Sequence, residues 1–254
     1  MPSSNPAFSP TTFGHFDDDA SRYAAGTTTT TMTVQGTALK SFALLAILMT
    51  TASWSWNQAA QHTINPAVLW GSLIAGMIVA WVTIAKNRWA PVTAPLYAAI
   101  EGVFLGAFSN FITQMSPRYH DLPYQAVALT CGTLFCMLFI YVTGLIKVTP
   151  RLAAGIVAAT GAIALVYLAS MVLSLFHVAM PIIHDASPLG IGFSLFVVGL
   201  AAFNLLLDFD SIEQGQRAGA PKYMEWYGAF GLMVTLVWLY LEILRLLRKI
   251  QDRR

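Results

Sequence analysis

The sequence is poor in charged residues. Asp, Glu, Lys and Arg make up only 10% of its 254 residues, against roughly 25% in an ordinary soluble domain. Hydrophobic residues make up 56%, and the mean hydropathy is +0.62. A water-soluble core cannot bury so much apolar surface. The net charge is only +2, with no large basic cluster before the last ten residues, so we expect no binding of nucleic acid.

Cysteine and intramembrane histidine are also scarce. Cys131 and Cys136 lie five residues apart in one apolar run, a spacing that fits neither a metal site nor a disulfide within one helix. We interpret them as buried thiols. After the N-terminal segment, the histidines fall in loops or at a helix end: His62, His120, His177 and His184. We therefore expect neither a histidine-based metal site nor a tightly bound cofactor.

Long apolar segments are what the sequence has instead. They cover residues 41–57, 66–85, 91–114, 125–147, 152–177, 189–209 and 227–246, with turn-forming residues between them. Runs of this length predict helices, because a backbone in lipid must satisfy its own hydrogen bonds. The alternating pattern of a membrane β-barrel is absent. The sequence thus predicts an all-α integral membrane protein with seven transmembrane helices.

Residues 1–38 differ in composition from the rest of the chain. They are rich in Ser, Thr, Pro and Gly, carry the acidic triplet Asp17 to Asp19, and lack the basic start and early apolar core of a signal peptide. Such a segment buries too little apolar surface to offset its ordering entropy. We predict a disordered polar tail over residues 1–38 and a membrane domain over residues 39–254.

Lysine and arginine in the short loops predict the orientation. With a cytoplasmic N-terminus, the cytoplasmic side carries Arg22, Lys40, Lys86, Arg88, Lys147, Arg151, Arg217 and Lys222, whereas the opposite loops carry only Arg118. Five basic residues near the C-terminus would then lie outside: Arg245, Arg248, Lys249, Arg253 and Arg254. The last segment either crosses the membrane or re-enters and returns; we favour a full crossing.

Four carboxylates fall within the apolar segments or at their ends: Glu101, Asp208, Asp210 and Glu242. A charge in the bilayer interior is costly and normally faces a cavity or a partner. Asn204, Asp208 and Ser211 share one helix face, with Asp210 roughly 200° away from Asp208. Asp208 is therefore the better candidate for an inward-facing group. The alternative is that the helix ends near Leu207 and both acids lie in a solvated loop.

The surroundings of the other two acids suggest partners. Glu242 precedes Arg245 by three residues, which permits an ion pair on one helix. Glu101 lies next to a small-residue face that suits close helix packing. Two roles remain open for it: a third carboxylate of the same site, or a partner for Lys86 or Arg88. That face consists of Gly102, Gly106, Ser109 and Thr113. We assign a similar line in the fifth segment, Gly155, Ala159 and Ala162, to packing alone.

Several of these stretches resemble one known family. "DFDSI" in the sixth segment, "LYLE" in the seventh and "EGVFLGAFS" in the third are similar to the Bax inhibitor family of seven-helix membrane proteins. "SNPAFS" and "RAGAPKYMEWYGAFGLMVTLVWLYLEILRLL" resemble a bacterial branch of it. The specific motifs cover about a quarter of the chain.

The resemblance implies a pH-gated calcium-leak channel, in which an acid on helix 6 and an acid on helix 7 share a hydrogen bond. Asp208 and Glu242 match these positions and would bind calcium weakly and transiently, and Lys86 or Arg88 would supply a basic partner. Two departures stand out: Glu replaces the usual Asp on helix 7, and the 34 residues from Asp208 to Glu242 exceed the family spacing by about ten. An early start of helix 7 would therefore place the two acids at different depths.

The function predicted from the sequence is a pH-sensitive calcium-leak channel of the bacterial cytoplasmic membrane, with the lipid bilayer, calcium and protons as its partners. One alternative is a proton-coupled transporter that uses the same acids. Another is a non-transporting regulator that binds a second membrane protein, such as a protease, through the N-terminal tail. An enzyme is not expected, because the segments contain no GxGD motif, no Ser/His pair and no metal-ligand set.

Overall fold

The computed structural model describes residues 31–61, 66–176 and 185–253. Seven long helices in this part of the chain are apolar enough to cross a membrane, so the predicted fold class is confirmed. They are α2 (Val34–Ala60), α3 (Pro66–Ala85), α4 (Ala90–Met115), α5 (Leu122–Thr143), α6 (Pro150–Leu175), α8 (Pro188–Arg217) and α9 (Met224–Asp252). Two short 3-10 helices, η1 (Asn87–Trp89) and η2 (Pro117–Tyr119), precede α4 and α5.

Local sequence signals set several helix ends. Thr149 and Ser187 cap α6 and α8, each accepting a hydrogen bond from a backbone N–H three residues on, and a proline follows each cap. The helix α5 ends at Gly144, which has φ 66°, a left-handed conformation that glycine adopts without a steric penalty. The helices α8 and α9 extend well beyond their apolar segments, because polar residues can continue the backbone hydrogen bonds outside the hydrocarbon layer.

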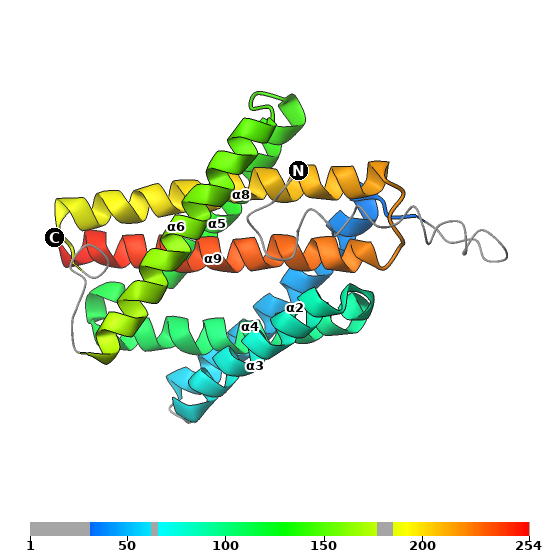
Figure 1. Ribbon diagram of the computed structural model, residues 1–254. Coiled ribbons are helices and arrows are strands. Elements are labelled where there is room, and N and C mark those ends of the chain that lie inside the picture. Colours follow the sequence, from blue (N-terminus) through cyan, green and yellow to red (C-terminus); the bar gives the residue numbers. More distant parts are fainter. Residues whose placement is uncertain (1–30, 62–65, 177–184, 254) are drawn as a thin grey trace.

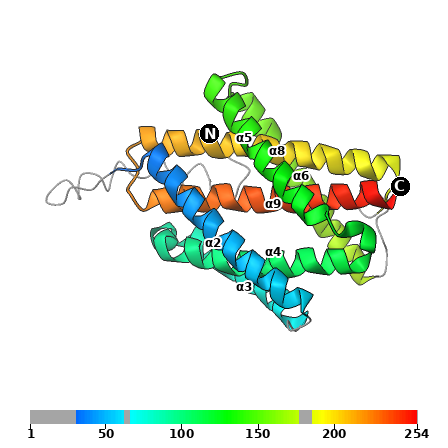
Figure 2. The ribbon, with the colours of Figure 1, turned by 180° about the vertical axis from the view of Figure 1, so that it is seen from behind.

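Helix α9 lies in the centre of the molecule. In Figures 1 and 2 it runs along the middle of the bundle, with α8 beside it and with α2, α4 and α5 packed around it. Tyr227, Phe230, Met233 and Leu239 of α9 are almost completely buried. Residues on every side of α9 therefore face protein, which makes it the reference axis for the positions of the buried polar groups.

The small-residue face on α4 packs against α2, as predicted. A Cβ atom added at Gly102 would overlap the backbone of Leu48, and one added at Gly106 would overlap the carbonyl of Ala52. The Ser55 hydroxyl also donates a hydrogen bond of 2.8 Å to the Val103 carbonyl. Glycine is required here because the two backbones are nearly in contact.

Two packing predictions are wrong. In α6, Gly155 has no atom within 4 Å of a Cβ position, and Ala162 is exposed. The face of α6 that packs on α8 instead contains the buried residues Ala153, Ile156 and Ile163. The two cysteines of α5 are exposed rather than buried. Both errors have one cause: small or apolar residues on a membrane helix can face lipid as readily as protein.

The helix α2 begins before the predicted start of the membrane domain. Thr33 caps its N-terminus, so residues 34–38, assigned to the tail, are helical. Met32 is only 1% exposed, and its N–H donates a 2.7 Å hydrogen bond to the Ala220 carbonyl between α8 and α9. The predicted disorder of residues 1–30 lies outside the described residues.

Candidate functional site

Asp208 lies inside helix α8. The helix continues to Arg217, so the alternative in which it ends near Leu207 is wrong. The side chain of Asp208 has no exposed surface, and Asn204 and Ser211 on the same face are also buried. The predicted inward-facing stripe is therefore present.

The two neighbours of Asp208 on this stripe already make hydrogen bonds within the protein. The Asn204 amide donates to the Thr160 hydroxyl of α6 at 3.0 Å and to the Leu200 carbonyl at 2.9 Å. The Ser211 hydroxyl donates to the Leu207 carbonyl at 2.7 Å. Asn204 thus connects α8 to α6, and Asp208 is the ionisable group of the stripe.

Glu242 in α9 is held by three side chains. Both of its carboxylate oxygens accept hydrogen bonds of 2.9 Å from Arg245, which confirms the predicted ion pair on one helix. The Tyr167 hydroxyl of α6 donates to Oε2 at 3.0 Å, and the Trp238 indole donates to Oε1 at 3.2 Å. Arg245 also donates to the Tyr167 oxygen at 2.6 Å. Glu242 is 1% exposed, and this network attaches α6 to the central helix.

The register between α8 and α9 separates Asp208 from Glu242. The two helices run antiparallel: Lys249 donates to the Gly190 carbonyl at 2.9 Å at one end, and Ile212 lies against Gly228 at the other. Asp208 is four residues before Ile212, so it lies level with about residue 232 of α9. Glu242 is then roughly ten residues, or about 15 Å, farther along the axis. That offset excludes a direct hydrogen bond between the two acids in this structure.

The acid that shares the depth of Asp208 is Glu101. Helices α4 and α9 run in the same direction: Tyr97 packs edge-on against Phe230 at 5.1 Å between ring centroids, and Ser109 hydrogen-bonds Tyr240 at 2.7 Å. By this register Glu101 lies level with about residue 233 of α9. Glu101 and Asp208 therefore lie at the same depth in the bundle, on two different neighbours of the central helix.

Glu101 is buried in the contact between α3 and α4. Its carboxylate interacts with the Tyr97 hydroxyl one turn earlier in α4, and its Oε2 lies 2.9 Å from the position of a Cβ at Gly76. Lys86 and Arg88 precede α4, whose first residue, Ala90, is roughly 17 Å along the helix from Glu101. The Lys86 ammonium group lies over the Trp89 ring, 4.3 Å from its centroid. Neither basic residue is therefore at the level of the acid.

Asp210 occupies another face of α8. It is half-buried and accepts a hydrogen bond from the Gln214 amide four residues later. The predicted separation of Asp210 from Asp208 is confirmed, since only Asp208 belongs to the fully buried stripe.

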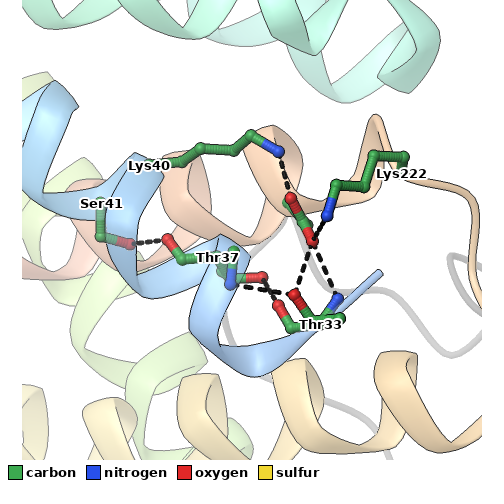
Figure 3. Close-up of polar contacts among 7 residues, drawn as sticks. Thr33, Thr37, Lys40, Ser41 and Lys222 are labelled. Atoms are coloured by element: carbon green, nitrogen blue, oxygen red, sulfur yellow. Dashed lines mark hydrogen bonds and ion pairs between the residues drawn. The ribbon is translucent and has the colours of Figure 1, made fainter. Parts of the chain in front are cut away.

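A further buried carboxylate, Glu225, lies at the end of the bundle where α2 begins. As Figure 3 shows, Lys40 and Lys222 converge on it. The Lys222 ammonium donates at 2.7 Å, and the N–H and hydroxyl of Thr33 each donate at 2.9 Å. Gly36 leaves the space that the carboxylate fills. This cluster fixes the residues before α2 to the start of α9.

Sequence reasoning missed several of these residues. Two contacts could have been predicted from helical spacing. Lys222 lies three residues before Glu225, and Trp238 lies one turn before Glu242. Tyr97 is likewise one turn before Glu101. Tyr167 and Lys249 gave no local signal, because their partners are on other helices.

The buried carboxylates are spread along the length of the bundle. In the part of the chain that the structure describes, no three His, Cys, Asp or Glu side chains gather into a metal site. Instead, four buried carboxylates lie at three levels along α9: Glu225 at its start, Asp208 and Glu101 farther in, and Glu242 beyond them.

These observations define the class of protein: a seven-helix integral membrane protein with buried carboxylates arranged around a central last helix. The model of the family "Bax inhibitor 1 like" matches residues 5–252. The chain belongs to this family, as its motifs predicted. Neither a comparison with curated proteins nor one with solved structures gave a match.

Proposed function

We propose that the protein is a calcium-permeable cation leak channel of the bacterial cytoplasmic membrane, with its conducting route beside α9 and with Asp208 as the central pH-sensitive group. The observation that carries the proposal is the complete burial of Asp208 inside a membrane-spanning helix, level with Glu101. A carboxylate in the bilayer interior is energetically costly, so it normally faces a partner or an ion pathway. Membership of the Bax inhibitor 1 like family supports the same function.

The staggered levels of the acids change the expected mechanism. Instead of one gate closed by a bond between Asp208 and Glu242, a cation would pass from the Glu225 end to the level shared by Asp208 and Glu101. Glu242 would lie roughly 15 Å farther on, already compensated by Arg245. Asp208 and Glu101 are therefore the proposed sensing residues, and Glu242 supports the structure beyond them.

Protonation sets the direction of the pH dependence. A neutral carboxyl group attracts a cation far less than a carboxylate does. The leak should therefore rise with pH as Asp208 and Glu101 lose their protons. It should be slow at acidic pH.

Calcium flux into liposomes tests the proposal directly. The purified protein is reconstituted, and calcium entry is followed at pH 6 and pH 8 for the native chain, Asp208→Asn and Glu101→Gln. Loss of an interaction of about 1.4 kcal/mol with the passing ion would slow the leak about tenfold. We expect Asp208→Asn to show this loss and to abolish the difference between the two pH values.

Asp210→Asn is the matched control, since it makes the same change two residues away on another face of α8. We expect it to keep both the rate and the pH dependence of the native protein. If Asp208→Asn also keeps them, the proposed site is wrong. Uptake of a solute against its gradient, driven by a pH difference, would favour a proton-coupled transporter.

A second candidate function is regulation of another membrane protein through the N-terminal segment. Met32 bonds to Ala220 and Thr33 bonds to Glu225. These bonds fix the residues that follow the N-terminal segment 1–30 beside the loop between α8 and α9, which favours a role for that segment. Deletion of residues 1–30 leaves these anchors intact. Loss of a cellular phenotype with an unchanged leak in liposomes would support a partner-binding role.

A further inference from the structure

A cavity of about 430 Å³ lies between α2, α4, α5 and α9. This volume falls within the range of small-molecule sites, about 300–1,000 Å³. None of the buried carboxylates lines the cavity, and its wall contains no charged side chain. The cavity is therefore separate from the proposed cation route and unsuited to an ion.

The cavity opens sideways, towards the bilayer. Its floor is buried and comes from α4 and α9: Leu105, Gly106, Ser109, Leu236, Val237 and Tyr240. The exposed lining residues belong to α2 and α5: Met49, Ser53, Asn57, Tyr124 and Cys131. The mouth thus lies between two helices that span the membrane, so lipid surrounds it.

Four hydroxyl groups in the wall already form hydrogen bonds within the protein. Ser109 and Tyr240 bond each other at 2.7 Å, Thr130 donates to the Ala126 carbonyl at 2.7 Å, and Ser53 donates to the Met49 carbonyl at 2.8 Å. These groups offer an incoming molecule little polar interaction. The occupant that fits such a wall is a hydrocarbon.

The dimensions and polarity of the cavity match one lipid leaflet. Its α2 wall runs from Leu45 to Asn57, about 18 Å of helix, whereas half of the hydrocarbon layer is about 15 Å. Trp56 and Tyr124, whose rings lie 5.9 Å apart, mark one end beside Asn57. Amphipathic aromatic rings favour the level of the lipid headgroups. Leucines line the opposite end.

We propose that this cavity binds one acyl chain of a phospholipid from the leaflet at the α2 C-terminal end. The chain enters between α2 and α5 and lies against Leu236 and Val237 of the central helix. Its ester region stays at the level of Trp56, Asn57 and Tyr124. A bound lipid would thus contact α9 directly.

Photo-crosslinking tests this site. The full-length protein is reconstituted into phosphatidylethanolamine and phosphatidylglycerol liposomes that contain a trace of phosphatidylethanolamine with a diazirine in its acyl chain. After illumination, labelled residues are identified by mass spectrometry. We expect the label to concentrate on the cavity wall, within residues 45–57 of α2 and 123–134 of α5.

Two tryptophan variants of α5 provide the comparison. Val127→Trp fills the cavity, whereas Leu129→Trp adds the same bulk on an exposed part of the helix outside the lining. We expect Val127→Trp to lose the label on the cavity wall and Leu129→Trp to keep it. Ser53→Trp, at the exposed mouth, repeats the test if Val127→Trp is not monodisperse by size exclusion.

Three results would overturn the proposal. Label spread equally over the lipid-facing surfaces of α3 and α6 would mean contact with bulk lipid only. Unchanged label in both filling variants would place the lipid elsewhere. Selective labelling by a photoreactive isoprenoid alcohol, with none by the phospholipid, would exclude an acyl chain as the occupant.

Discussion

At the scale of single residues, the donors around each buried carboxylate decide what it does. Glu225 accepts hydrogen bonds from Lys40, Lys222 and both donors of Thr33. Glu242 accepts hydrogen bonds from Arg245, Tyr167 and Trp238. These bonds use both oxygens of each carboxylate. These two acids are therefore suited to holding helices together. In the proposed function, Asp208, level with Glu101, is the group that takes up and releases protons.

Replacing Glu242 should cost stability through its partners. Glu242→Gln turns an acceptor oxygen into an amide donor that faces Arg245, Tyr167 or Trp238. We expect the free energy of unfolding in detergent to fall by about 2 kcal/mol, the usual cost of an unsatisfied buried group. A double-mutant cycle with Arg245→Met measures the coupling. Additive effects of the two changes would contradict the ion pair.

Glu225 offers the same test at the other end of α9. All of its donors face the carboxylate, so Glu225→Gln places an N–H₂ group against ammonium groups and should lower stability by about 2 kcal/mol. The control is Glu213→Gln, which changes a partly exposed carboxylate bonded to the exposed Arg217 and to the Tyr141 hydroxyl. Exposed pairs contribute about 0–1 kcal/mol. Equal losses in the two variants, measured by thermal unfolding, would argue against the buried cluster.

At the scale of helices, the distance between neighbouring backbones distinguishes the helix faces that pack inside the bundle from the faces that are exposed to lipid. Helices α2 and α4 touch through Gly102 and Gly106, where no side chain fits. Helix α6 packs on α8 through ordinary apolar side chains and through the Asn204–Thr160 bond. Identical small residues thus have opposite roles on α4 and α6.

Two glycine-to-alanine changes should consequently have opposite effects. In Gly106→Ala the new methyl group meets the Ala52 carbonyl, which belongs to the backbone and cannot move aside. We expect a loss of about 1–3 kcal/mol, as for other overpacked sites. Gly155→Ala meets open space and should be neutral or stabilising by up to about 1 kcal/mol, since alanine favours helix. Thermal unfolding of both variants decides; destabilisation by Gly155→Ala would contradict the assigned packing.

At the scale of the whole molecule, α9 connects the start of α2 with the start of α8. It is one unbroken helix from Met224 to Asp252. Its first turn joins the start of α2 through Glu225, whereas Lys249 near its end is buried against Gly190 at the start of α8. The two ends of α9 therefore lie at opposite ends of the bundle, as Figure 1 shows.

This arrangement predicts that the C-terminus lies on the side of the membrane opposite the N-terminus. Seven crossings from a cytoplasmic N-terminus place the C-terminus outside, despite its basic residues. A C-terminal alkaline phosphatase fusion should be active and a C-terminal green fluorescent protein fusion dark, with the reverse result at the N-terminus. Fluorescence from both terminal fusions would contradict a full crossing by α9.

The sequence alone determined the class of the fold, its seven helices and the inward face of α8. Each follows from local physics: apolar runs long enough to span lipid, and a helical period that places Asn204, Asp208 and Ser211 together. The ion pair of Glu242 with Arg245 was also predictable, because three residues on a helix bring two side chains together.

Only the tertiary structure decided which of these groups share a depth, because depth depends on the register between helices and no local pattern encodes it. Motif resemblance paired Asp208 with Glu242, yet the antiparallel contacts of α8 with α9 place them about 15 Å apart. The parallel packing of α4 on α9 brings Glu101 to the level of Asp208 instead. Likewise, Glu225 forms an ion pair with Lys40, which is 185 residues away in the chain, and only the folded bundle creates this contact.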